Sequence, residues 1–281
     1  MRHVLRLYLL LGALCLASPR TALAESASIV SIATPRGVQQ PFILIKPDHP
    51  VASVILLAGG NGVLRLDRVT PLTIDDVVAG NFLVRSRRKF VAHDFTVAVV
   101  DVPSDRQNGM DGVFRVSKEH AIDIGAVADY LKNQAGVPVW LVGTSAGTWS
   151  AVRGAIGAAR DEIATASIDG LVLTSTTTRV PPPLRDRPGS VLSMPLPEIR
   201  VPTLIVSHRD DACPWTPAAD APALAERLKH ASKVEIALLD GGLKPLSVPC
   251  EAYAQHGFLG IETETVDRIA QFITANGERM R

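Results

Sequence analysis

Residues 137–148 read Val-Pro-Val-Trp-Leu-Val-Gly-Thr-Ser-Ala-Gly-Thr and contain the pattern G-x-S-x-G. The run over residues 137–142 is short and almost continuously apolar, which is typical of a strand buried on both faces of a sheet. Residues 148–160 have a helical pattern. The segment therefore predicts a strand, a tight turn and a helix, with Ser145 on the turn at the carboxyl edge of the sheet.

Glycines flank this serine on both sides. A residue on such a turn has strained backbone angles, and glycines at positions 143 and 147 let neighbouring chain pass close by without a side-chain clash. The motif alone is a weak signal, and its position between strand and helix strengthens it. The alternative is a Gly-Ser turn with no chemical role.

The same alternation extends on both sides of this segment. Short apolar runs predict further strands over residues 51–57, 95–101, 170–174, 203–207 and 234–239, and helical patterns lie over residues 76–90, 120–134, 217–230 and 262–276. Upstream, residues 28–34 and 42–46 flank a turn-like Pro35-Arg36-Gly37, which predicts a hairpin at the sheet edge. The chain is therefore of the α/β class, with a single doubly wound, mostly parallel sheet flanked by helices.

Composition supports a globular chain of this kind. Of its 281 residues 47% are hydrophobic and 20% are charged, and the net charge of +1 gives no bias toward nucleic acid. Residues 176–201 hold six prolines and form the only long irregular stretch. Because strands of the same style continue beyond it, we interpret it as a loop over one domain and not as a linker between two.

The first 24 residues predict a secretory signal peptide. Arg2 and Arg6 precede an apolar run over residues 7–17, and Ala22-Leu23-Ala24 forms a small-x-small cleavage site. The apolar run is about half the roughly 20 residues that a membrane span requires. We therefore expect a soluble exported protein, periplasmic or extracellular, whose mature domain is residues 25–281. A lipoprotein is the alternative because of Cys15, but Leu14 stands where lipid attachment favours a small residue.

Two cysteines remain after cleavage, Cys213 and Cys250. An even count in an oxidising compartment predicts one disulfide, and two buried free thiols are the alternative. A disulfide that closes the loop from Cys213 to Cys250 would stabilise the fold by about 3–4 kcal/mol in the chain-entropy model.

With this elbow-like serine motif and strand–helix alternation, the sequence resembles the α/β-hydrolase superfamily of serine hydrolases over nearly all of the mature chain. Members of that family place an acid after a later strand and a histidine after the last one. Here Asp211 follows the strand predicted over 203–207, and His256 precedes the last helix. The resemblance implies Ser145 as nucleophile, His256 as base and Asp211 as the carboxylate that orients it, with the adjacent Asp210 as the alternative acid.

The resemblance also implies two backbone donors for an oxyanion. One is the N–H of Ala146, directly after the serine, and the other comes from Gly60 or Asn61 in the glycine-rich segment 58–62. Ala58 occupies the place where many members carry histidine. A nucleotide-binding role for these glycines fails because neither G-x-G-x-x-G nor G-K-[ST] is present.

Other histidines compete for the role of base. His208 lies beside the predicted acid, where it is expected to line the pocket, but the position after the last strand favours His256. His49, His93, His120 and His230 precede strands or border helices and are expected to be surface or capping residues.

These features predict a serine hydrolase that cleaves a small-molecule ester, without metal or organic cofactor, nucleic-acid partner or membrane span. A peptidase or acyltransferase with the same triad and a non-catalytic binding protein on the same fold are the alternatives. A Cys213–Cys250 bond would tie the acid loop to the histidine loop and hold both in place for catalysis. No motif indicates an oligomeric state.

Overall fold

The computed structural model describes residues 27–70, 74, 77, 80–163, 168–180 and 189–277. The predicted signal peptide, residues 1–24, lies outside these ranges, as do residues 181–188 of the proline-rich segment. Among the described residues, no helix combines the length and the apolar character needed to span a membrane.

Eight strands form one sheet in the order β1-β2-β4-β3-β5-β6-β7-β8. Their bounds are β1 Ala27–Ala33, β2 Gln39–Ile45, β3 Ala52–Leu57, β4 Phe95–Val100, β5 Val139–Thr144, β6 Gly170–Thr174, β7 Thr203–His208 and β8 Val234–Leu239. The β1–β2 and β2–β4 pairs are antiparallel, and all other neighbouring pairs are parallel. The structure confirms the mostly parallel sheet and the hairpin at its edge.

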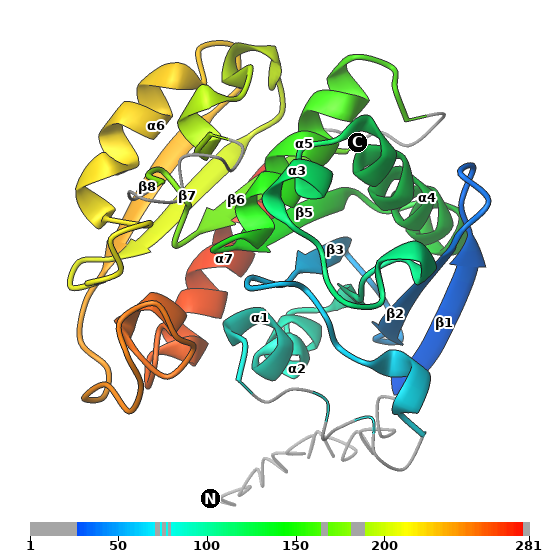
Figure 1. Ribbon diagram of the computed structural model, residues 1–281, viewed down its shortest axis with the longest axis horizontal. Coiled ribbons are helices and arrows are strands. Elements are labelled where there is room, and N and C mark those ends of the chain that lie inside the picture. The colour runs from blue at the N-terminus through cyan, green and yellow to red at the C-terminus, as the bar shows by residue number, and fades with distance from the viewer. Residues whose placement is uncertain are drawn as a thin grey trace, which may run out of the picture.

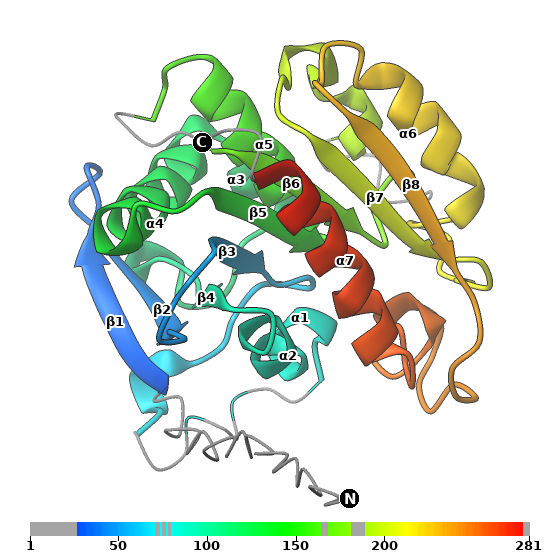
Figure 2. The ribbon, with the colours of Figure 1, turned by 180° about the vertical axis from the view of Figure 1, so that it is seen from behind.

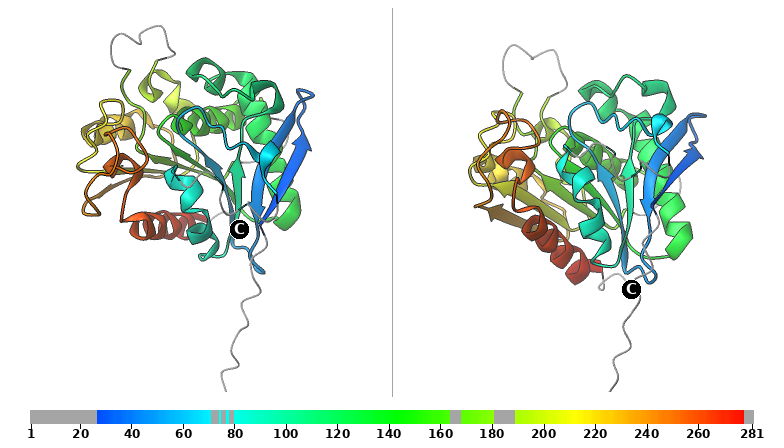
Figure 3. Two further views of the ribbon diagram at one scale, coloured as in Figure 1. Left: turned by 60° about the horizontal axis from the view of Figure 1, so that its bottom comes forward. Right: turned by 90° about the horizontal axis from the view of Figure 1, so that it is seen from below.

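Helices cover both faces of this sheet (Figures 1 and 2). The helices α3, α4, α5 and α6 lie on one face, and α1, α2 and α7 lie on the other, so that the edge-on views show the sheet between two helical layers (Figure 3). Their bounds are α1 Phe82–Arg85, α2 Arg87–Val91, α3 Gly112–Arg115, α4 Lys118–Ala135, α5 Gly147–Ala159, α6 Ala221–Arg227 and α7 Glu262–Gly277.

The sheet separates two hydrophobic cores. Alternate residues of each central strand enter opposite cores: Leu141 packs with α4 and α5, whereas Trp140 and Val142 pack with α7. Because both faces are buried, apolar residues occupy successive positions of the strand, which explains the near-continuous apolar runs in the sequence.

Two helical predictions differ from the structure. The helix predicted over residues 76–90 is interrupted within its described part, because α1 ends at Arg85 and α2 begins two residues later, with Ser86 in a non-helical conformation between them. The helix predicted over 217–230 is shorter: a 3₁₀ turn at Ala218–Asp220 precedes α6, which ends at Arg227. The described part of the proline-rich segment holds two further 3₁₀ turns, Val191–Ser193 and Leu196–Glu198.

The turn between β5 and α5 is built on close backbone contact with the end of β3. A Cβ placed on Gly147 would lie 2.0 Å from the Leu57 carbonyl oxygen and 2.9 Å from that of Ala58. Both obstacles are backbone atoms, which cannot rotate away as a side chain can. Only glycine therefore lets α5 begin where it does.

Replacing this glycine should destabilise the protein. We expect Gly147→Ala to lower the free energy of unfolding by about 1–3 kcal/mol, because the new methyl group forces the backbone of β3 and α5 apart. Gly154→Ala, in the same helix, is the matched control: the atoms nearest to its Cβ belong to side chains, Leu141 Cδ1 at 2.7 Å and Ile124 Cγ2 at 3.2 Å, and not to backbone, and alanine favours the helix. Chemical denaturation of both variants measures the difference, and equal effects would contradict the role of the β3 contact.

Candidate active site

A cavity of about 490 Å³ lies at the carboxyl edge of the sheet. The loops that follow β3, β5, β6 and β7 each contribute to it, together with the segment before α7. Its lining consists of Gly59, Gly60, Gly80, Asn81, Phe82, Thr144, Ser145, Ala146, Trp149, Thr177, Cys213, Trp215, Cys250, Glu251, Ala252, His256 and Gly257. The sequence thus brings its predicted serine and histidine to one cavity.

Ser145 is held in a strained conformation on the turn after β5. Its φ of 52° lies in the left-handed region, which a non-glycine residue rarely adopts. Its N–H donates to the Thr174 carbonyl at 3.1 Å, and its own carbonyl accepts from the N–H and the hydroxyl of Thr148 at 2.9 and 2.6 Å. Strain of this kind persists where surrounding bonds hold it, and it is characteristic of functional sites.

The glycine-rich loop after β3 passes directly beside this serine. A Cβ on Gly59 would lie 2.9 Å from the Ser145 Cβ and 3.0 Å from the Thr144 carbonyl oxygen. A side chain at position 59 would therefore displace either the loop or the serine. The absence of a side chain allows the loop backbone to line the cavity next to the serine hydroxyl.

His256 pairs with Asp211 beneath the cavity. The imidazole Nδ1 lies 3.1 Å from Asp211 Oδ2, and the side chains are 7% and 0% exposed. The other carboxylate oxygen accepts from the Cys213 N–H at 2.9 Å. Asp210 is exposed and lies outside this arrangement, and its N–H donates to the Nδ1 of His208. Of the two candidate acids, the geometry joins only Asp211 to His256.

Thr216 is a member of this group that the sequence did not single out. Its hydroxyl donates to Asp211 Oδ2 at 2.7 Å, and its oxygen lies 3.0 Å from His256 Nδ1. The hydroxyl therefore fixes the carboxylate and faces the imidazole nitrogen that the carboxylate orients. A threonine five residues after an acid is a common pattern, so sequence alone gave no specific signal for it.

Two further contacts hold the backbone of the histidine segment. The Ser175 hydroxyl, directly after β6, donates to the His256 carbonyl at 2.8 Å, and Arg85 donates to the Gly257 carbonyl. Arg85 is itself paired with Glu262 at 2.9 Å. Ser145 and His256 line the same cavity, and no hydrogen bond joins their side chains in the described part of the chain.

Gly60 and Ala146, whose N–H groups the sequence predicts as donors, line the same cavity as Ser145. The N–H groups of Gly60 and Ala146 have no hydrogen-bond partner among the described residues, and both residues line the cavity. Asn61 lies outside the lining, where its carbonyl accepts from the Met110 N–H and its side chain accepts from Val63. The geometry therefore favours Gly60 over Asn61 as the partner of Ala146.

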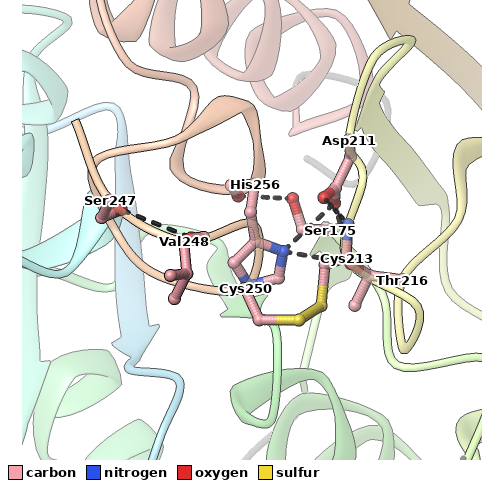
Figure 4. The surroundings of a disulfide bond; sticks show 8 residues. All are labelled: Ser175, Asp211, Cys213, Thr216, Ser247, Val248, Cys250 and His256. Carbon is pink, nitrogen blue, oxygen red and sulfur yellow. Dashed lines mark hydrogen bonds and ion pairs between the residues drawn. A yellow bond between two sulfur atoms is a disulfide. The ribbon is translucent and has the colours of Figure 1, made fainter. Parts of the chain in front are cut away.

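A disulfide joins Cys213 to Cys250 in the neighbourhood of Asp211 and His256 (Figure 4). The two Cα atoms are 4.7 Å apart, and both residues line the cavity. Cys213 follows Asp211 by two residues and Cys250 precedes His256 by six, so the bond links the acid loop to the histidine segment. The structure thus confirms the pairing predicted from the sequence.

The remaining histidines correct two expectations. His208 does not line the cavity, because its ring is buried and faces the Gly241 carbonyl at 3.1 Å. His120 is 1% exposed and not a surface residue, and neither of its ring nitrogens has a hydrogen-bond partner among the residues that the structure describes. In the described part of the chain, no group of three or more His, Cys, Asp or Glu side chains could hold a metal ion.

Comparison with known proteins shows similarity in structure alone. No family model and no curated protein sequence matches the chain. An esterase of Pyrococcus furiosus superposes with a TM-score of 0.59 at 17% identity, over 89% of this chain and 93% of that one. Brefeldin A esterase, a bacterial homologue of human hormone-sensitive lipase, gives a TM-score of 0.62 at 15% identity, over 96% and 81% of the two chains.

A dienelactone hydrolase of Anabaena variabilis gives a TM-score of 0.56 at 14% identity, over 90% and 98% of the two chains. The chain has the α/β-hydrolase fold. Ser145 follows β5, a central strand of this sheet. The fold predicted from the sequence is confirmed over the described residues.

The buried His120 should make the protein sensitive to acid. Burial, with the nearby charge of Arg115, lowers the pKa of His120 to about 3, below its ordinary value near 6.5. The unfolded state therefore binds a proton that the folded state does not, and stability falls as the pH drops from about 6.5 toward 3. Denaturation at pH 7 and pH 5 should show a larger loss of stability for the wild type than for His120→Phe. Equal losses would contradict a neutral buried imidazole.

Proposed function

We propose that the chain is a serine hydrolase that cleaves carboxylic esters through a covalent acyl-enzyme. Ser145 is the nucleophile, His256 the general base and Asp211 the carboxylate that orients the imidazole. The observation that carries the proposal is the convergence on one cavity of a strained serine, a buried His–Asp pair and two unpartnered backbone N–H groups.

The reaction proceeds in two steps on these groups. Ser145 Oγ attacks the ester carbonyl carbon while its proton passes to His256 Nε2, and the oxyanion of the tetrahedral intermediate accepts from the N–H groups of Gly60 and Ala146. Collapse expels the alcohol, which takes the proton from His256. Water then attacks the acyl-serine while His256 takes a proton from it, and collapse releases the carboxylic acid as His256 returns that proton to Ser145 Oγ.

The cavity supports a small ester as the substrate. Trp149, Trp215 and Phe82 give it aromatic walls, and no Lys or Arg is among its lining residues. Apolar walls with few polar groups are typical of small-molecule sites. Solved structures with the same fold include two esterases and a dienelactone hydrolase, which agrees with ester chemistry at this site.

We also propose that the protein is exported. The predicted signal peptide would direct the chain out of the reducing cytoplasm, and residues 25–281 would form the mature domain. The Cys213–Cys250 bond supports this location because disulfides persist in oxidising compartments.

An activated serine can be tested directly by covalent labelling. Incubation with a fluorophosphonate should add one adduct, which peptide mapping places on Ser145. The Ser145→Ala variant should give no adduct and no ester turnover while unfolding within about 1 kcal/mol of the wild type, because the side chain packs little. Labelling of neither protein, with the wild type folded, would favour the non-catalytic alternative.

Breaking the disulfide tests whether it holds the acid and histidine in place. We expect the double variant Cys213→Ala, Cys250→Ala to unfold more easily by about 2–4 kcal/mol. Its turnover of p-nitrophenyl acetate should also fall at temperatures where it stays folded, because the two loops lose their covalent link. Unchanged turnover in a folded double variant would show that the disulfide stabilises the fold and does not position the catalytic groups.

A further inference from the structure

Arg115 is a buried cation behind the glycine-rich loop that follows β3. It ends α3, which lies beside α5, and its side chain is among the largest that are fully buried (Figure 1). One terminal nitrogen donates to the Ser150 hydroxyl at 2.8 Å. The other donates to the carbonyls of Ala58 and Gly60 at 3.2 and 3.1 Å. The guanidinium thus joins the loop to the helix that begins after Ser145.

This charge is not compensated by an acid. Among the described residues no Asp or Glu forms an ion pair with Arg115, whereas the similarly buried Arg153 pairs with Glu162. Burial lowers the pKa of Arg115 to about 10, so the group still carries its charge at neutral pH. An unpaired buried charge is costly, and proteins retain such features where they serve function.

The two hydrogen bonds that Arg115 donates to the glycine-rich loop complete a set of contacts along that loop. They hold the carbonyls of Ala58 and Gly60, while the Gly59 carbonyl accepts from the Gly62 N–H at 3.2 Å and the Asn61 carbonyl accepts from the Met110 N–H. Four successive carbonyls are therefore fixed, whereas the Gly60 N–H has no hydrogen-bond partner in the described part of the chain.

Arg115 acts on the peptide groups that flank this donor. The Gly60 N–H belongs to the peptide between residues 59 and 60, and the guanidinium holds the carbonyl of the peptide on each side of it. Gly60 has a φ of 59° and no side chain, so its backbone conformation depends on hydrogen bonds to the loop. The Gly62 N–H holds the carbonyl of the peptide that carries the donor, and Arg115 holds the carbonyls of the peptides on either side. Without Arg115 the two flanking peptides would lose these hydrogen bonds.

We propose that Arg115 is a positioning residue for the oxyanion site, which fixes the Gly60 N–H toward the cavity and places a buried positive charge behind the developing oxyanion. The inference rests on the proposed ester hydrolysis. A donor fixed before the reaction, in a site with little water, stabilises a transition-state charge without reorganising during the step. The residue touches neither substrate nor the reacting atoms and acts through the loop.

The test is Arg115→Met, which keeps the length of the side chain and removes its donors and charge. With p-nitrophenyl acetate we expect kcat to fall by about 100-fold, the scale of losing one oxyanion donor, with KM changed by less than about 3-fold. The Ser145 hydroxyl adds to the carbonyl of a trifluoromethyl ketone and forms an oxyanion. This ketone should therefore bind more weakly to the Arg115→Met variant, by a similar factor. Arg115→Lys keeps the positive charge but cannot make both hydrogen bonds to the Ala58 and Gly60 carbonyls. This variant should therefore retain part of the kcat that Arg115→Met loses.

A matched control separates positioning from general destabilisation. Leu131→Ala removes a fully buried side chain from α4 and should lower the melting temperature while kcat and the ketone affinity stay near wild type. If Arg115→Met does not fold, the Lys variant decides by the same readouts. Unchanged kcat and ketone affinity in a folded Arg115 variant would overturn the inference. If the folded wild-type protein neither reacts with the fluorophosphonate nor hydrolyses p-nitrophenyl acetate, the proposed function is overturned, and the inference about Arg115 with it.

Discussion

The close contact between the end of β3 and the start of α5 is the constraint on which the candidate site depends. Gly147 lets α5 begin against the Leu57 carbonyl, and Gly59 lets the loop after β3 pass beside Ser145. Each glycine makes room for the backbone of the other segment. The contact places the strained serine beside the backbone of the glycine-rich loop, an arrangement that neither segment could achieve alone.

The other half of the site comes from distant parts of the chain, and the parallel sheet brings them together. The ends of β6 and β7 lie at the same edge as the end of β5, so Ser175 and Asp211 emerge beside the elbow. His256 belongs to no strand, and its segment needs other anchors: the Ser175 hydroxyl, the Arg85 side chain and the Cys213–Cys250 bond. A long segment after the last strand is therefore held by hydrogen bonds and one covalent link.

Much of this arrangement could be predicted from local patterns. Strand–helix alternation indicated the sheet because buried parallel strands require continuous apolar runs, and the disulfide followed from an even cysteine count. The choice between Asp210 and Asp211 could not be made, because it depends on which side chain of a loop turns inward. Thr216 and Arg115 were missed for a related reason: each acts through tertiary contacts with residues distant in sequence. Such contacts leave no short motif.

Two buried charged groups, Asp211 and Arg115, lie on the two sides between which the proposed reaction separates charge. When Ser145 attacks, positive charge develops on His256 and negative charge on the substrate oxygen. The buried carboxylate of Asp211 lies next to the imidazole, and the buried guanidinium of Arg115 lies behind the amides that face the oxygen. Both charges are fixed by hydrogen bonds before substrate arrives. In the proposed reaction, two buried charges placed in this way favour the transition state over the neutral ground state, because Coulomb interactions are more weakly screened in an interior than in water.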